Sequence, residues 1–290
     1  MQPYNHKTIE ILEQFDFNAE KTAAAIRDGE VSLSEDEKLR AKQTRNGAVR
    51  EVLKLCYDNG IKIITLDDKE YPALLRNIDN PPIVLFCAGN LNDLDSSLTI
   101  SAVGTRKPSE YGIAVTRRII PQLTKVGAVI TSGLAVGIDA AAHKSCLNSG
   151  GRTIGVLACG ILVNYPMENA GLKRGIVENG GAVISELLPF TRPSADYFQY
   201  RNRIISGLSL GTLIIEASDK SGALITANHA CEQGREVFFI PPHDILSPRF
   251  MGVAALGRDG ATPVYSYLDI LYALLKTADL TEFINEHYSE

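Results

Sequence analysis

Apolar positions in residues 1–60 are separated by three or four residues, a spacing that predicts helices packed on one side. Asn59-Gly60 ends this pattern, because glycine after the last apolar turn is a typical helix stop. Two short apolar runs typical of strands follow, at 61–66 and 83–88. We therefore predict a small helical domain over 1–60 and a linking extension with short strands over 61–96.

Beyond residue 97, short apolar runs alternate with stretches of helical periodicity, which is typical of a parallel sheet with helices on both faces. Strands are predicted near Leu98–Val103, Ala128–Thr131, Thr153–Ala158, Ala182–Ser185, Thr212–Ile215, Val237–Ile240 and Thr262–Val264. Helices are predicted near 110–125, 137–149, 168–179, 199–209, 222–233 and 267–276. The pattern predicts an α/β fold, a doubly wound and mostly parallel Rossmann-like sheet over 97–276, followed by an acidic tail over 277–290.

Composition narrows the class of protein. No apolar run approaches the roughly 20 residues that a membrane helix needs, and the first residues do not resemble a secretory signal, so we expect a cytoplasmic protein without a membrane partner. The five cysteines are scattered and form no C-x-x-C pair, which argues against disulfides and structural zinc and predicts five buried, reduced thiols.

The charge of the chain is unevenly distributed. The formal net charge is −5, yet residues 96–276 hold 17 Lys and Arg against 13 Asp and Glu. The predicted sheet domain is therefore mildly basic between two acidic ends, and its local charge is compatible with an anionic ligand.

Three predicted loops at the carboxyl edge of the sheet combine glycine with cationic or hydroxyl side chains. In such a sheet, ligands bind beyond the strand ends, where helix N-termini present free backbone N–H groups. The candidate phosphate-binding residues in these loops are Gly104, Thr105, Arg106 and Lys107, then Ser132 and Gly133, then Lys220, Ser221 and Gly222. Taken one at a time, each glycine could equally serve only a tight turn. Neither a dinucleotide G-x-G-x-x-G nor a Walker loop occurs.

A fourth candidate segment is Arg201-Asn202-Arg203, which we expect in the first turn of a helix. Both arginines are candidates for phosphate contact, and one of them could instead pair with Glu216 or Asp219. The neighbouring aromatic residues could stack on bases or pack in the core, namely Tyr197, Phe198 and Tyr200.

The sequence supports a catalytic site less well than a phosphate-binding site. Asp139 and His143 stand one helical turn apart, but no nucleophile has a matching context, so a helix-stabilising contact is favoured. Glu168 and Glu186 could serve a nucleosidase-like hydrolase, although the P-G-G-x-G-T-x-x-E signature of that group is absent. We expect no catalytic residue, metal site or cofactor; a scaffold whose glycine loops are only turns is the third alternative.

The motifs taken together resemble the DNA-processing protein A (DprA, also called Smf) family between about Asp67 and Leu271. The motifs that carry the resemblance are Tyr71-Pro72, Gly104-Thr105-Arg106, Ser132-Gly133 through His143, Tyr165-Pro166, Ser185-Glu186, Arg201-Asn202-Arg203 through Leu208, and Lys220-Ser221-Gly222. The chain departs from the family pattern at Pro241-Pro242-His243 and Gly252-Val253-Ala254.

The resemblance implies an extended Rossmann fold with a SAM-like N-terminal helical domain. It also implies a homodimer that binds single-stranded DNA without sequence preference and loads the RecA recombinase during natural transformation. The phosphate-binding positions of the family map onto Arg106, Ser132, Gly133, Lys220, Ser221 and Gly222.

Overall fold

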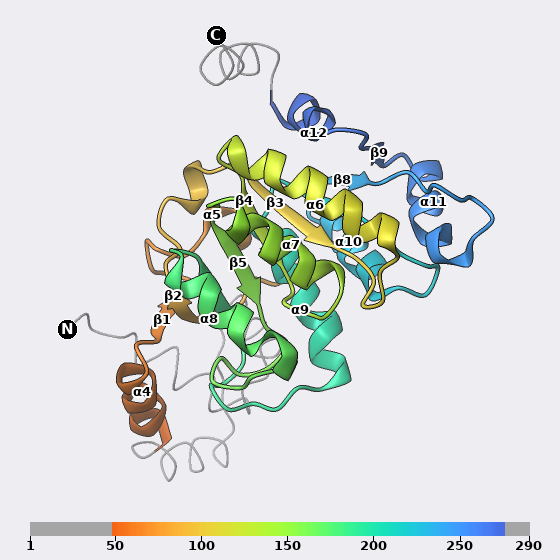
Figure 1. Cartoon of the computed structure of the whole chain (residues 1–290). Helices are drawn as coiled ribbons and strands as arrows, with labels where there is room; N and C mark the ends of the chain where they lie inside the picture. Colours follow the sequence, from red (N-terminus) through yellow and green to blue (C-terminus); the bar gives the residue numbers. More distant parts are fainter. Residues whose placement is uncertain (1–47, 276–290) are drawn as a thin grey trace.

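The computed structural model describes residues 48–275 (Figure 1). Its strands are β1 Lys62–Thr65, β2 Val84–Gly89, β3 Thr99–Val103, β4 Val129–Ser132, β5 Thr153–Val156, β6 Ala182–Ser185, β7 Gly211–Ile214, β8 Glu236–Phe239 and β9 Thr262–Pro263. Its α-helices are α4 Ala48–Asp58, α5 Ala73–Arg76, α6 Glu110–Lys125, α7 Ile138–Asn148, α8 Ala170–Glu178, α9 Ala195–Gly207, α10 Gly222–Glu232, α11 Met251–Arg258 and α12 Tyr267–Leu274. Residues 1–47 of the predicted helical domain and the predicted acidic tail, 277–290, lie outside the described part.

All nine described strands join one sheet in the order β1-β2-β6-β5-β4-β3-β7-β8-β9. The pairs β1–β2 and β2–β6 are antiparallel, and the others are parallel. The chain proceeds from β3 outward through β4, β5 and β6, then returns to the other side of β3 as β7. The carboxyl ends of β3 and β7 therefore form the switch point at which sheets of this type bind ligands.

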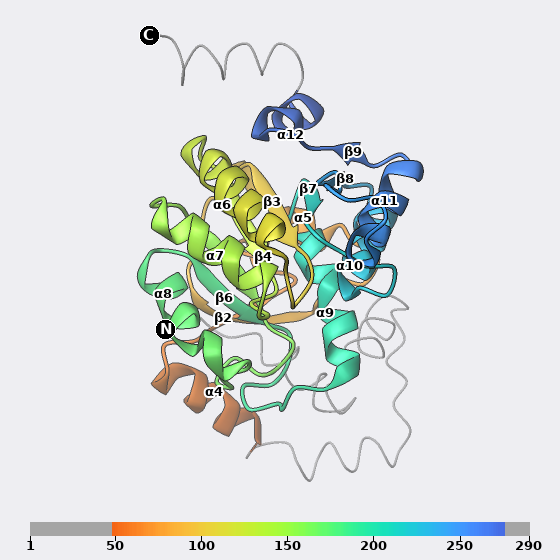
Figure 2. The ribbon, with the colours of Figure 1, turned by 45° about the vertical axis from the view of Figure 1, so that its right-hand side comes forward.

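Helices cover both faces of the sheet, as the two views in Figures 1 and 2 show. One face packs against α9 and α10 through residues such as Ile204 and Ala227. The other face packs against α6 and α7 through residues such as Ile120 and Ala142, and beside them α8 contributes Ile176. The central strands are buried on both faces, which explains why they appear in the sequence as continuous apolar runs.

The structure confirms the α/β class, the mostly parallel sheet and the predicted strands and helices of the region beyond residue 97. It also confirms strands at 61–66 and 83–88, and shows that the predicted linking extension, 61–96, adds β1 and β2 to the main sheet. The helix before Asn59 ends at Asp58, and Gly60 takes the left-handed conformation with φ 64°.

Two expectations were wrong, and one helix was missed. Helix α9 begins at Ala195, directly after the N-cap Ser194, so Arg201 and Arg203 lie in its interior instead of its first turn. Helix α11 was not predicted, because it is short and contains two glycines; Gly252 allows it to pack against the backbone of Ala217 and Ser218. Four of the five cysteines are buried as expected, but Cys231 is exposed.

Candidate nucleic-acid interface

The loops after β3 and β7 and the helix α9 share one surface depression of about 450 Å³. Its lining includes the four-residue segment Gly104–Lys107, residues Arg201 and Asn202 of α9, and Ser221 and Gly222 at the start of α10. These segments are far apart in the sequence and meet because β3 and β7 are neighbours in the sheet. Eight of the twelve predicted site residues therefore lie around a single hollow at the switch point.

Arg106 and Lys107 are the exposed cations in the lining of this depression. The guanidinium carbon of Arg106 lies 4.8 Å from the centre of the Phe198 ring. The Tyr165 ring lies 5.7 Å from the Phe198 ring, and Arg106, Tyr165 and Phe198 also line a smaller adjoining hollow. A cation on one aromatic ring beside a second ring is a surface suited to a phosphate and its attached base.

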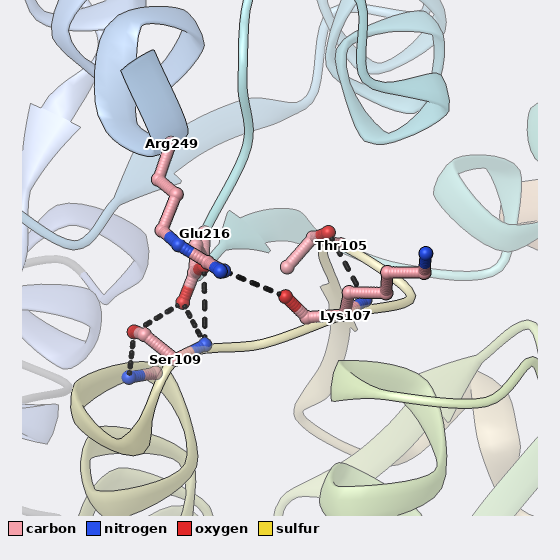
Figure 3. Close-up of polar contacts among 6 residues, drawn as sticks. Thr105, Lys107, Ser109, Glu216 and Arg249 are labelled. Atoms are coloured by element: carbon pink, nitrogen blue, oxygen red, sulfur yellow. Dashed lines mark hydrogen bonds and ion pairs between the residues drawn. The ribbon is translucent and has the colours of Figure 1, made fainter. Parts of the chain in front are cut away.

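A buried carboxylate anchors the loop that carries Arg106 (Figure 3). Glu216 is 1% exposed and accepts hydrogen bonds from the backbone N–H of Ser109 at 2.9 and 3.2 Å and from the Ser109 hydroxyl at 2.7 Å. The Ser109 hydroxyl in turn caps α6 by accepting from the N–H of Gly112. Arg249 completes the anchor: its Nη1 lies 3.3 Å from the Glu216 carboxylate and donates to the Lys107 carbonyl at 2.9 Å.

The same loop is also held from the side of α7. The backbone N–H of Thr105 donates to the Glu216 carbonyl, and the N–H of Ile138 donates to the Thr105 carbonyl. Gly137 has φ 88°, and a Cβ at this position would overlap the backbone of Thr105 and Arg106. The glycine at the entry of α7 is therefore required by the close approach of the Arg106 loop.

Arg201 lies at the base of the depression and is only 5% exposed. Its Nη1 donates to the backbone carbonyls of Gly133 and Val156, so the side chain ties α9 to the ends of β4 and β5. Burial lowers the pKa of Arg201 to about 10, against the opposing attraction of Asp139. Burial likewise raises the pKa of Asp139 to about 6, although the Arg201 charge opposes this shift.

Arg203 is neutralised by an acidic neighbour. Its guanidinium meets both carboxylate oxygens of Glu186, at 2.6 and 3.2 Å, and both side chains are more than nine-tenths buried. The guanidinium also stacks on the Tyr200 ring at 4.0 Å. The expected partners for the arginine pair, Glu216 and Asp219, were wrong: the partner of Arg203 is Glu186, and Glu216 pairs with Arg249.

The loop after β4 packs against Arg201 at the base of the depression. The Ser132 hydroxyl is buried and donates to the Ala102 carbonyl at 2.6 Å, and a Cβ at Gly133 would stand 2.6 Å from both Arg201 and Asp139. His143 is fully buried, with Nδ1 2.7 Å from the Thr153 hydroxyl, and burial lowers its pKa to about 3.

The N-terminus of α10 forms the opposite rim. The Ser221 hydroxyl accepts from the N–H of Ala223, while Lys220 and Gly222 are exposed. Asn202 donates to the Gly222 carbonyl at 3.2 Å and so joins α9 to this rim. The positive end of the α10 dipole and the exposed lysine next to it favour an anion here.

The structure thus separates the predicted residues into two groups. Those that line the depression are Gly104, Thr105, Arg106, Lys107, Arg201, Asn202, Ser221 and Gly222; those outside its lining are Ser132, Gly133, Arg203 and Lys220. Sequence reasoning missed the anchoring role of Glu216 and Arg249. A carboxylate directly after the buried run of β7 was a usable signal for Glu216, whereas nothing local in the sequence marks Arg249.

Two further properties bear on the chemistry available. Among residues 48–275, no group of three or more His, Cys, Asp or Glu side chains is placed to hold a metal ion. Within the same range, no helix is both long and apolar enough to cross a lipid bilayer.

Comparison with known proteins identifies the family of the chain. Residues 62–275 match the family model described as DNA recombination-mediator protein A. The chain belongs to this family. The resemblance to DprA and Smf proteins is thereby confirmed, and the matched region contains all twelve candidate site residues.

Named relatives show the extent of the similarity. DNA processing protein DprA of Bacillus subtilis is 41% identical over 223 residues, which cover 77% of this chain and 74% of that protein. Protein Smf of Synechocystis is 46% identical over 216 residues, which cover 73% of this chain and 54% of that protein. The match therefore spans between about half and three quarters of the length of these relatives.

Two solved structures are similar in fold. The X-ray structure of DprA from Streptococcus pneumoniae has a TM-score of 0.77 and 33% identity, covering 93% of this chain and 92% of that one. A structure of DprA from Helicobacter pylori, described in terms of its single-stranded DNA binding mode, has a TM-score of 0.65 and 29% identity, covering 73% and 95%.

Proposed function

We propose that this protein binds single-stranded DNA, without sequence preference, through the depression at the switch point of its sheet. The observation that carries the proposal is the convergence of the Arg106 loop, the start of α10 and the Phe198 face of α9 on one hollow. Its family membership supports the same ligand, because a relative from Helicobacter pylori is described by its single-stranded DNA binding mode.

The chemistry of the lining suits a strand without its complement. Arg106 and Lys107 in the lining, and Lys220 beside it, are exposed cations suited to contact phosphates, and such contacts do not depend on sequence. Phe198 and Tyr165 offer ring faces to bases, which are accessible for stacking only when they are unpaired. Arg201 takes a positioning role, because its guanidinium is committed to two backbone carbonyls.

We further propose that the bound strand is protected and delivered to the RecA recombinase during natural transformation, in the cytoplasm, by a homodimer. These parts follow from family membership and need their own tests. Sedimentation at micromolar concentration tests the dimer, and RecA-dependent strand exchange on DNA coated by a single-strand binding protein tests the delivery.

We also propose that binding involves no catalysis. Asp139, the acidic residue in the lining of the depression, is only 6% exposed. Glu186, the carboxylate considered above for a hydrolase, is 5% exposed in its side chain and engaged by Arg203 through both oxygens. Such a carboxylate has no free lone pair directed at solvent with which to activate a water molecule.

The decisive experiment compares the affinity for labelled oligo-dT with that for duplex DNA of equal length, in the wild type and in Arg106→Glu. Arg192→Glu provides the matched control, since Arg192 is exposed and lies outside the depression. We expect the wild type and the control to prefer the single strand and Arg106→Glu to lose most of that binding. Equal binding by all three proteins, or a preference of the wild type for duplex, would refute the proposal.

A further inference from the structure

A second hollow, of about 640 Å³, lies between α6 and α7 on the face of the sheet opposite α9. Ile113 and Gly137 line it near the starts of the two helices, and Pro121 and Asn148 line it near their ends. The hollow exists because α7 presents the small side chains of Ala140, Ala141 and Ser145 to it. Since residues 113 and 121 are eight positions apart, the groove is about 12 Å long.

Two cations face this groove without a partner. Arg117 of α6 and Lys144 of α7 both line it and are exposed. Neither head group makes a hydrogen bond or ion pair with any other residue of the part that the structure describes. Glu168 is the one acidic residue in the lining, so the groove keeps an excess of one positive charge.

The groove lies next to the proposed DNA site. The depression and the small hollow beside it share Arg106, Ala135 and Phe198, and the small hollow and the groove share Val136. Both helices begin at the carboxyl edge of the sheet, next to the loop that carries Arg106 (Figures 1 and 2). Val136 is thus the point at which a strand held at Arg106 would enter the groove.

We propose that the groove between α6 and α7 is a second subsite for the same DNA strand, in which Arg117 and Lys144 each contact a phosphate. The inference rests on the proposed function and extends its binding site by two positions that the sequence motifs do not include. At the duplex spacing of about 3.4 Å per nucleotide, a 12 Å groove holds at most about three to four nucleotides, and a more extended single strand places fewer there, which still allows two phosphate contacts.

The test compares oligo-dT of about 6 nucleotides, which fills the depression alone, with oligo-dT of about 20 nucleotides, which reaches both subsites. The variant is Arg117→Ala with Lys144→Ala. The matched control is Arg118→Ala with Lys125→Ala, which removes the same charge from exposed positions of α6 outside the groove. Thermal unfolding of all three proteins verifies that these exposed substitutions leave the fold intact.

We expect the groove variant to bind the long strand more weakly, with a salt slope reduced by about 1.4, because each single-strand phosphate contact contributes about 0.7. Its affinity for the short strand should equal that of the wild type, and the control should match the wild type with both strands. Wild-type behaviour of the groove variant with the long strand would overturn the subsite, as would equal weakening with both strands. Failure of the wild type to bind either strand would instead overturn the proposed function itself.

Discussion

The anchor beneath the Arg106 loop gives the sharpest prediction about how the site is built. Replacing Glu216 by Gln keeps the size of the side chain but removes its charge and turns one acceptor into a donor. The two oxygens now accept from the Ser109 N–H, the Ser109 hydroxyl and Arg249. An amide in the same place confronts at least one of these donors with its own N–H group.

The cost follows from the burial of the carboxylate. Hydrogen bonds to a charged group contribute roughly 1.5–3 kcal/mol each, and a buried donor that loses its acceptor costs a similar amount. We therefore expect Glu216→Gln to lower the free energy of unfolding by about 3 kcal/mol. For a domain of this size, that loss corresponds to a fall in Tm of about 6–12 °C.

The DNA affinity of Glu216→Gln distinguishes the effect of a displaced Arg106 loop from the effect of the lost negative charge. Removal of a negative charge near a DNA site should by itself strengthen binding, whereas a displaced Arg106 loop should weaken it. We expect oligo-dT affinity to fall about tenfold at a temperature well below Tm, equivalent to about 1.4 kcal/mol.

The control is Glu236→Gln, which makes the same charge change at an exposed position of β8. Fluorescence anisotropy and thermal unfolding of both variants provide the measurement. Unchanged Tm of Glu216→Gln, or binding as tight as that of Glu236→Gln, would refute the anchoring role.

Three further predictions concern the supports around the site. Arg203→Met should lower the unfolding free energy measured in urea by about 3–5 kcal/mol, because it leaves Glu186 buried without its cation, and the double variant with Glu186→Met should recover part of that loss. Because burial lowers the pKa of His143 to about 3, the unfolded chain takes up this proton first, and stability falls as pH drops below about 6.5. Between pH 7 and 4.5, the free energy of unfolding should therefore fall by about 2.5 kcal/mol more in the wild type than in His143→Gln. Parallel pH profiles of the two proteins would count against this prediction. Gly137→Ala should weaken oligo-dT binding, because the new methyl group displaces the backbone of Arg106; a crystal structure of the variant with that loop unmoved would disprove this reason.

The strands of the sheet could be predicted because a strand buried on both faces is a continuous apolar run. The start of α9 could not be located in the same way. Its first turn, from Ala195, carries polar and aromatic residues without clear periodicity, and the apolar signal begins only near Ile204. The predicted start was about one turn too late. In the structure, Arg201 and Arg203 therefore lie in the middle of the helix and are buried, instead of standing at its exposed first turn.

The part of the candidate site that a single loop forms could be predicted from the sequence. Gly104 to Lys107 follows a buried strand, and its place at the sheet edge follows from strand order alone. The fates of Ser132 and Arg203 were not predictable, because each depends on a partner far away in the sequence, Ala102 and Glu186. Arg249 belongs to none of the motifs that carry the family resemblance, and only the folded chain brings it to Glu216.

The salt dependence of oligo-dT affinity tests the central claim most directly. With oligo-dT of about 6 nucleotides, which does not reach the groove, three exposed cations in or beside the depression, Arg106, Lys107 and Lys220, predict a slope of about −2 for log K against log salt, since each single-strand phosphate contact contributes about 0.7. The Arg106→Ala variant should lower the magnitude of that slope by about 0.7, while Arg258→Ala, an exposed change on α11, should leave it unaltered. A flat salt dependence of the wild type, or equal slopes in the wild type and Arg106→Ala, would contradict the account.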